Sequence, residues 1–253
     1  MLNTRRLART GKAAIAVASL SFCFQGCAPE LSVCNDGNGW GCQGYPVGPR
    51  GYGYSGLNSP PFSKEDIQKM QMIDGLIHAA ETGDVTAVGD YLDKGVDANS
   101  TDRYDNAPGN SPLIKAVRNG HTDVVRLLIA RKANPNQKNE AGEYPLMDAI
   151  SYDYKEIAGV LLKAGADPNV RNKEGDTTLI VTVWKSAAAM NDYKKLGHDG
   201  PLVKKEQMEI AAMLIASGAD MNAVGQDNKP PLTIAEQNHD TEMADILRTK
   251  MAK

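Results

Sequence analysis

Apolar residues recur along this chain with helical spacing, and the whole pattern repeats after 33 residues. Val124 and Leu128 lie four positions apart, which places both side chains on one face of a helix. Ile157 and Leu161 take the same two places in the next copy of the pattern. A fixed period of this length, with two helical segments in each copy, predicts a stacked array of helix pairs in which each copy buries its apolar face against its neighbours.

Short motifs repeat in the same register as the apolar positions. Ser111-Pro112-Leu113 falls on Tyr144-Pro145-Leu146, and Asn134-Pro135-Asn136 falls on Asp167-Pro168-Asn169. Together with the turn Asn119-Gly120-His121, these pieces closely resemble the ankyrin repeat. The resemblance implies an all-α ankyrin repeat solenoid of about five helix-turn-helix units joined by hairpin loops.

The same unit continues on both sides of these two copies. The predicted ankyrin repeat domain covers residues 63–253, with units at about 73–99, 106–138, 139–171, 172–224 and 225–253. The fourth unit is 20 residues longer than the period, because Gly218-Ala219-Asp220 follows Gly165-Ala166-Asp167 by 53 residues. This extra length predicts an insertion within the fourth unit.

The first and fourth units are expected to depart from the regular repeat. Ser63, followed by acidic residues, has the pattern of an N-cap and predicts a separate capping helix before an inner helix at Gly75–Glu81. In the fourth unit we expect a longer inner helix, a loop over Tyr193–Pro201 and a second helix over Lys204–Ser217. A loop inserted between helices leaves the stack intact, and it is either a site of specific function or a neutral insertion.

Each unit needs residues that accept a positive φ at two turns. Glycine takes this conformation at no steric cost, and asparagine tolerates it best among the others. The expected exits from the second helices are Gly95, Lys132, Gly165 and Gly218, and the expected hairpin turns are Gly109, Gly142, Gly175 and Asn228. Lys132 is the exception among the exits, and holding a lysine there costs about 1 kcal/mol.

The N-terminal 27 residues have the pattern of a bacterial lipoprotein signal. A basic start, Met1–Lys12, precedes an apolar run, Ala13–Phe24, that is short for a membrane span. Gly26-Cys27 resembles the end of a lipobox, although the two residues before Gly26 depart from the usual pattern. We expect lipidation at Cys27, with Ala28 favouring the outer membrane and hence a periplasmic location. The alternatives are a soluble periplasmic or secreted protein, and a retained anchor.

Residues 28–62 are rich in glycine and proline and cannot bury enough apolar surface to fold as a domain. We predict a flexible linker that spans about 30 Å and holds the repeats off a membrane. Cys34 and Cys42 lie in this linker as one even pair. In an oxidising compartment such a pair predicts a disulfide, and two free thiols are the alternative.

Charge and motifs exclude several classes of function. Without the first 27 residues the chain has 24 basic and 31 acidic residues, a net charge of −7, which disfavours binding to nucleic acid or to anionic membranes. Membrane contact is therefore expected only through the lipid. No pair of histidines has H-E-x-x-H spacing, and no G-x-S-x-G elbow occurs. We expect no catalytic residues, no metal site and no cofactor, with an enzyme as a remote alternative.

The resemblance implies that a partner protein binds the hairpin tips and the exposed, concave face of the inner helices. Matching the units position by position gives the expected contact residues Arg103, Tyr104, Arg118, Asn119, Ser151, Tyr152, Lys173, Glu174, Trp184 and Lys185. Tyr152 and Trp184 matter most, because truncating such residues in interfaces costs about 2 kcal/mol or more. The alternative for Trp184 is that it packs under the inserted loop.

These patterns together predict a non-catalytic protein-binding module tethered in the bacterial cell envelope. Bacterial ankyrin lipoproteins resemble proteins that sequester toxic, envelope-targeted effectors, which implies an immunity-type role. The alternative is a scaffold or stabiliser for a resident periplasmic enzyme. The expected partner is therefore another protein of the envelope, either a toxin or a resident enzyme.

Overall fold

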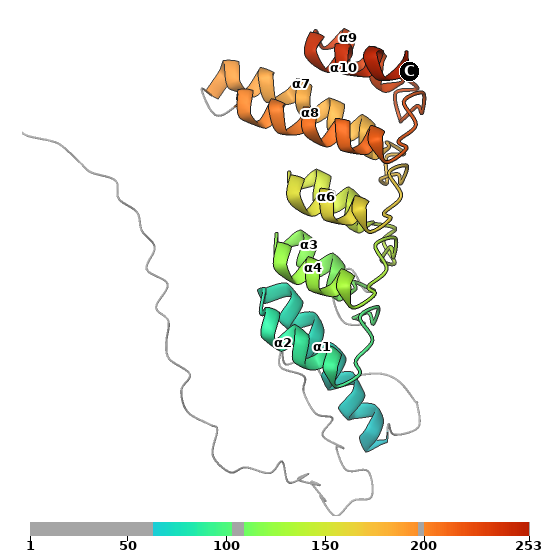
Figure 1. Cartoon of the computed structure of the whole chain (residues 1–253). Coiled ribbons are helices and arrows are strands. Elements are labelled where there is room, and N and C mark those ends of the chain that lie inside the picture. The colour runs from blue at the N-terminus through green and yellow to red at the C-terminus, as the bar shows by residue number, and fades with distance from the viewer. Residues whose placement is uncertain (1–62, 103–108, 197–199, 253) are drawn as a thin grey trace, which may run out of the picture. The chain divides into compact units, whose positions relative to one another are not determined.

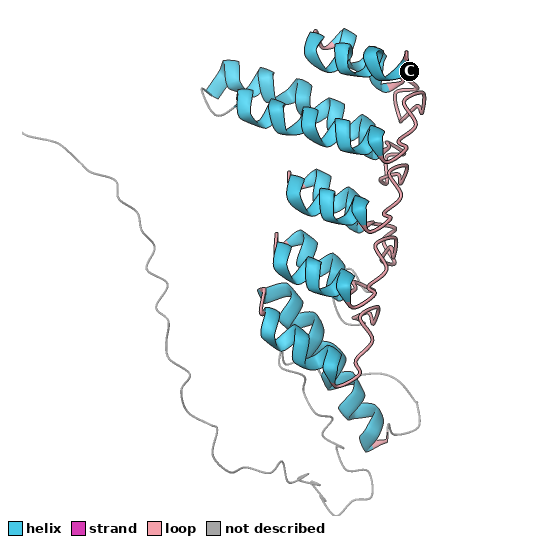
Figure 2. Ribbon diagram, in the orientation of Figure 1, coloured by secondary structure: helices cyan, strands magenta, loops and turns pink. Residues whose placement is uncertain are grey.

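The computed structural model describes residues 63–102, 109–196 and 200–252. The helices in these ranges are α1 (Lys64–Thr82), α2 (Val85–Asp93), α3 (Pro112–Arg118), α4 (Thr122–Ala130), α5 (Pro145–Ser151), α6 (Lys155–Lys163), α7 (Thr178–Leu196), α8 (Gly200–Ala216), α9 (Pro231–Gln237) and α10 (Thr241–Met251). The described residues contain no strand (Figure 2), and one isolated bridge joins Arg171 to Thr177. The predicted all-α class is confirmed.

The helices form pairs that stack in chain order (Figure 1). The inner helices α1, α3, α5, α7 and α9 contact one another in succession, and so do the outer helices α2, α4, α6, α8 and α10. The loops between successive pairs run along one side of the stack (Figure 1). This is the predicted ankyrin repeat solenoid, in which each unit contacts only its neighbours.

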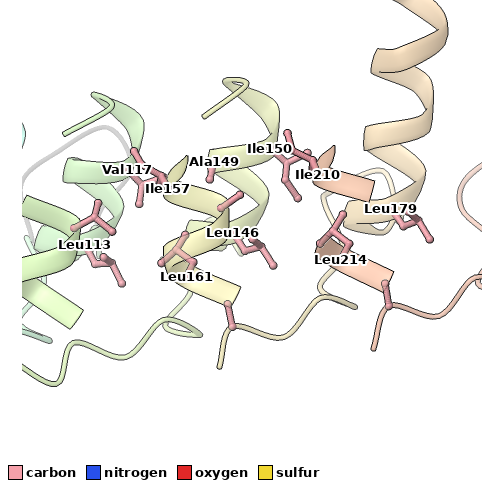
Figure 3. Close-up of a cluster of buried hydrophobic side chains, with 14 of the residues drawn as sticks. Leu113, Val117, Leu146, Ala149, Ile150, Ile157, Leu161, Leu179, Ile210 and Leu214 are labelled. Atoms are coloured by element: carbon pink, nitrogen blue, oxygen red, sulfur yellow. The ribbon is translucent and has the colours of Figure 1, made fainter. Parts of the chain in front are cut away.

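Each helix pair buries an apolar stripe against the next pair. Leu113 of α3, Leu146 of α5 and Leu179 of α7 share one repeat position, and none is more than 1% exposed. Figure 3 shows these side chains together with Leu161 and Leu214 of the outer helices, lying between successive pairs. Burying a side chain of this size contributes about 1.5–3 kcal/mol. The interfaces between units therefore hold the array together.

Local chemistry sets where the helices begin. Ser63 and Asp66 form a capping box at α1, with the Asp66 N–H donating to the Ser63 hydroxyl at 3.1 Å. The predicted break before the inner helix at Gly75 is wrong, because α1 continues without interruption to Thr82. A Cβ at Gly75 would lie 2.3 Å from the Tyr91 hydroxyl. Close packing against α2 therefore outweighs the cost of about 1 kcal/mol for a glycine inside a helix.

The turns use left-handed residues where the sequence predicts them. Gly95 and Gly142 have φ values of 86° and 79°, and Asn228 has a φ of 53° at the last hairpin. Lys132 is also left-handed, with a φ of 67°. The repeat therefore imposes this backbone conformation even where the side chain disfavours it.

A ladder of asparagine side chains joins the loops of successive units. The Asn136 side chain accepts a hydrogen bond from the Asp167 N–H at 2.8 Å and donates one to the Gly165 carbonyl at 2.9 Å. Asn99 and Asn169 make the same pair of contacts in the units before and after. Each of these residues therefore satisfies backbone groups of the following unit, and the ladder adds a polar connection to the apolar interfaces.

The 20 extra residues of the fourth unit lengthen both of its helices. α7 runs to Leu196 and α8 begins at Gly200, so the predicted loop over Tyr193–Pro201 and the predicted helix start at Lys204 are both wrong. Alanine and lysine favour helix in α7, and proline is tolerated in the first turn of α8. The two helices also contact each other extensively, and they extend past the neighbouring pairs in Figure 1. Tertiary packing thus supplies stability that local propensity does not include.

Candidate partner-binding face

Six of the predicted contact residues lie in one row across neighbouring inner helices. Arg118 ends α3, Ser151 ends α5, and Trp184 takes the matching place within α7. The next residue in each unit completes the row, namely Asn119, Tyr152 and Lys185. Because α3, α5 and α7 contact one another in succession, the fold brings these positions together on one side of the array.

Other predicted features fall on residues that the structure does not describe. These are the hairpin residues Arg103 and Tyr104, the lipidation site Cys27, the pair Cys34 and Cys42, the signal peptide at 1–27 and the linker at 28–62. They stay predictions.

Two aromatic side chains in the row are open to solvent. Tyr152 is 52% exposed and Trp184 is 37% exposed. The Tyr152 ring stacks on the half-buried Tyr154, with ring centroids 6.0 Å apart. Trp184 lies one unit further along, next in sequence to Lys185. Exposed aromatic rings on neighbouring units offer the type of surface that dominates binding energy in protein interfaces.

Lys185 ties α7 to the turn that carries Tyr152. Its ammonium donates a 2.6 Å hydrogen bond to the Ser151 carbonyl and lies 2.9 Å from the Asp153 carboxylate. Gln207 of α8 donates a 2.6 Å hydrogen bond to the same carboxylate. Both residues that flank Tyr152 in the chain are therefore held by the extended helix pair. Lys185, predicted as a contact residue, thus joins α7 to the turn after α5.

The sequence interpretation overlooked Asp153 and Gln207. Asp153 has a φ of 63° at the turn between α5 and α6, in the place where the preceding units have Gly83 and Gly120. Aligning the units shows an aspartate where the repeat uses glycine, and this departure is a signal that could have identified Asp153. Gln207 is fully buried, which its residue type alone does not suggest.

Arg118 is held inside a polar network. Its guanidinium donates to Asp148 at 2.8 Å and to Glu143, and it lies 3.4 Å from the Asn110 side-chain oxygen. Lys173, another predicted contact residue, lies 2.9 Å from Glu143. The Arg118 contacts join the second and third units, and the Lys173 contact joins the third and fourth, so both basic residues already have partners within the array.

The electrostatics of this network favour a charged Glu143. Hydrogen bonds from Lys173, from Asn139 and from Arg118 lower the pKa of Glu143 from 4.5 to about 2. Burial raises the pKa of Asp148, against the attraction of the Arg118 guanidinium. The two carboxylates thus share one arginine, but their pKa values are shifted in opposite directions.

Two remaining predicted contacts differ in their surroundings. Asn119 donates from its side-chain amide to the Lys115 carbonyl at 2.9 Å, and the Asn119 backbone N–H donates to the same carbonyl at 3.2 Å at the end of α3. Glu174 lies exposed in the hairpin loop before Gly175. Of the two, Asn119 has a clear structural role within its own unit.

Neither a metal site nor a membrane span is found in the part of the chain that the structure describes. Across 63–102, 109–196 and 200–252, no three His, Cys, Asp or Glu side chains converge as metal ligands. None of the helices in these ranges is both long enough and apolar enough to cross a bilayer.

Comparison with known proteins agrees with the repeat architecture. Residues 76–172 match the family model for ankyrin repeats, in three copies. Residues 76–172 are therefore ankyrin repeats, and ankyrin repeats are modules for protein–protein interaction.

A segment of 65 residues is 38% identical to the 2-5A-dependent ribonuclease of Mus musculus. This similarity covers 26% of the present chain and 8% of the mouse protein. The chain therefore spans only a small part of the length of the curated relative it matches.

Proposed function

We propose that this ankyrin array is a non-catalytic module that binds another protein through the concave face of its inner helices. The observation that carries the proposal is the exposure of Tyr152 and Trp184 on neighbouring units of one row. Aromatic side chains of this kind supply large contact areas and find few other uses on a solvated surface. Ser151 and Asn119 continue the same row and contribute polar contacts at its edge.

We place this binding in the bacterial envelope, with the protein anchored to the outer membrane through Cys27. Two uses follow from that location. In the first, the array sequesters a toxic effector that acts in the envelope. In the second, it is a scaffold or stabiliser for a resident periplasmic enzyme. The identity of the bound protein decides between the two.

The test is affinity capture from an envelope extract. The protein is immobilised beside a Tyr152→Ala/Trp184→Ala variant, and retained proteins are identified by mass spectrometry. We expect one protein to be retained in stoichiometric amount by the natural sequence and lost from the variant. If no protein distinguishes the two samples, the concave face is not the binding site.

A matched control separates loss of the face from general surface change. Arg126 and Glu156 form an exposed ion pair between the outer helices α4 and α6. The Arg126→Ala/Glu156→Ala variant also removes two exposed side chains, but from the outer helices, and it should keep the partner. Circular dichroism and thermal melting establish that all variants are folded.

The envelope tether has a test of its own. Cys27→Ser removes the thiol that would receive the lipid, so labelling with a radioactive fatty acid should disappear from the variant. In membrane fractionation, the variant should then be found in the soluble periplasmic fraction. Unchanged fractionation and labelling would exclude Cys27 as the attachment site.

A further inference from the structure

The fourth unit forms a step where it meets the third. α5 has 7 residues and α7 has 19, so α7 continues beyond the level at which α5 ends. Figure 1 shows α7 and α8 extending past the neighbouring pairs. Tyr152 is the C-cap residue of α5, and Trp184 lies on α7 at the position that matches Ser151. We call the surface made by Ser151, Tyr152, Trp184, Lys185 and Ala188 the aromatic step.

The charges at the aromatic step neutralise one another. Lys185 lies 2.9 Å from Asp153, and these are the ionic groups next in sequence to Trp184 and Tyr152. On the preceding inner helix, α3, Arg118 is paired with Asp148 at 2.8 Å and with Glu143. Close pairs of opposite charge produce little field at a distance, and salt screens what remains. The step therefore attracts neither an acidic nor a basic partner strongly.

The backbone beneath Tyr152 is fixed before any partner binds. Lys185 holds the carbonyl of Ser151, and Lys185 and Gln207 together hold the carboxylate of Asp153. The Tyr152 ring stacks on Tyr154 with an angle of 26° between the ring planes. A side chain positioned in this way loses little conformational freedom on association, so more of its contact energy appears as affinity.

Resting on the proposed function of the concave face, we propose that the aromatic step binds an uncharged, apolar segment of another protein. The segment presents a bulky aliphatic or aromatic side chain to Tyr152 and Trp184. Burial of apolar area supplies the affinity, at about 25 cal/mol for each Å² removed from water. Because the neighbouring charges are already paired, a charged segment would displace existing ion pairs without gaining new ones.

Selection of displayed random peptides on the immobilised full chain tests this inference without a known partner. We expect the enriched peptides to contain leucine, phenylalanine or tryptophan and to have a net charge near zero. Their affinity should change less than about twofold between roughly 50 and 500 mM NaCl. The same peptides should bind Tyr152→Ala/Trp184→Ala at least about tenfold more weakly, a loss that corresponds to about 1.4 kcal/mol.

Conservative variants separate ring contact from folding. Tyr152→Phe and Trp184→Phe keep an apolar ring at each position, so both should retain binding within a few-fold. Enrichment of acidic or basic peptides, affinity that falls steeply with salt, or the absence of peptides that distinguish the alanine variant would each overturn the inference.

Failure of this inference and failure of the proposed function give different results. A captured protein that needs Tyr152 and Trp184 but binds with strong salt dependence would leave the concave face as the binding site and refute the uncharged segment. A concentration-dependent dimer that the alanine variant abolishes would show that a second copy of this chain covers the step, which also refutes it.

Discussion

The side-chain amide of Gln207 donates a 2.6 Å hydrogen bond to the Asp153 carboxylate, 54 residues earlier in the chain. His121 and Tyr154 occupy the same repeat position as Gln207. The His121 ring lies 2.9 Å from the Glu81 carbonyl oxygen, in the last turn of α1. The Tyr154 ring lies 3.0 Å from the place that a Cβ on Gly120 would take. This junction position therefore joins each outer helix to the turn of the unit before it.

The last unit uses the same junction position with different chemistry. Asp240 is 4% exposed, and it accepts a 2.6 Å hydrogen bond from the Ser186 hydroxyl. Lys204 of α8 lies 3.1 Å from the same carboxylate. The long helices α7 and α8 are thus connected to both neighbouring units, which stiffens the C-terminal part of the array.

Substitution of Gln207 tests the junction. Gln207→Ala leaves a cavity at a fully buried site and removes the bond to Asp153, so we expect a loss of about 2–3 kcal/mol in the free energy of unfolding. Gln207→Met keeps the volume and removes an amide whose buried oxygen has no hydrogen-bond partner among the described residues, so it should cost less than about 1 kcal/mol. Urea unfolding measures both.

A neighbouring exposed residue provides the control for this series. Glu209 lies on the same helix and pairs with Lys155 on the surface. Glu209→Ala should leave the urea midpoint close to that of the natural protein, because exposed ion pairs contribute little to stability. Equal losses for the alanine and methionine substitutions of Gln207 would show that the hydrogen bond, and not packing, dominates the junction.

The asparagine ladder predicts a difference between an internal and a terminal unit. Asn136→Ala removes two inter-unit hydrogen bonds, to Gly165 and from Asp167, and should cost about 1–3 kcal/mol. Asn222 takes the same repeat position, but its side chain has no such contact with the described residues that follow. Asn222→Ala should therefore be close to neutral. Similar melting temperatures for the two variants would contradict the ladder as a source of stability.

Lys132→Gly is expected to stabilise the protein. Lys132 is held at a φ of 67°, and glycine removes a steric cost of about 1 kcal/mol, partly offset by the greater freedom of glycine in the unfolded chain. The reverse change serves as the control at Gly165, where an added Cβ meets nothing within 4 Å. Gly165→Ala should destabilise through the backbone alone. A drop in thermal midpoint for Lys132→Gly would refute the strain argument.

Acid should weaken the network around Arg118 through Glu143. A folded-state pKa lowered from 4.5 to about 2 contributes stability above pH 4.5, and this contribution is lost as the pH falls toward 2. Since the Glu143 side chain is 28% exposed, we discount the contribution to about 1 kcal/mol. Glu143→Gln should therefore flatten the decline in urea stability across this pH window.

Asp148 gives the opposite sign in the same experiment. Burial raises the pKa of Asp148. Its charged form therefore lowers the free energy of unfolding at high pH, and this loss disappears as the pH falls and the carboxylate gains a proton. Asp148→Asn should make the acid decline steeper than in the natural protein. Parallel pH profiles for the two variants would exclude this division of roles.

Much of the candidate face was predictable because the repeat places equivalent residues at equivalent positions. Aligning the units brings Tyr152 and Trp184 to one row, and the contacts between successive inner helices confirm that row. The roles of Arg118 and Lys185 were not predictable in this way. Their side chains reach Asp148 and Asp153 in neighbouring units. A pattern along the sequence does not specify the direction in which a long side chain points.

The sequence by itself determined the architecture, since period, apolar spacing and turn residues all act within one unit and its neighbours. Even the strained Lys132 was foreseeable from its place in the repeat. Only the tertiary structure decided that α1 continues through Gly75, and that helix covers residues 193–196 and begins again at Gly200, where the sequence predicts a loop. Glycine and proline mark breaks locally, but the close packing of Gly75 against Tyr91 of α2, and the contacts between α7 and α8, outweigh a local preference of about 1 kcal/mol.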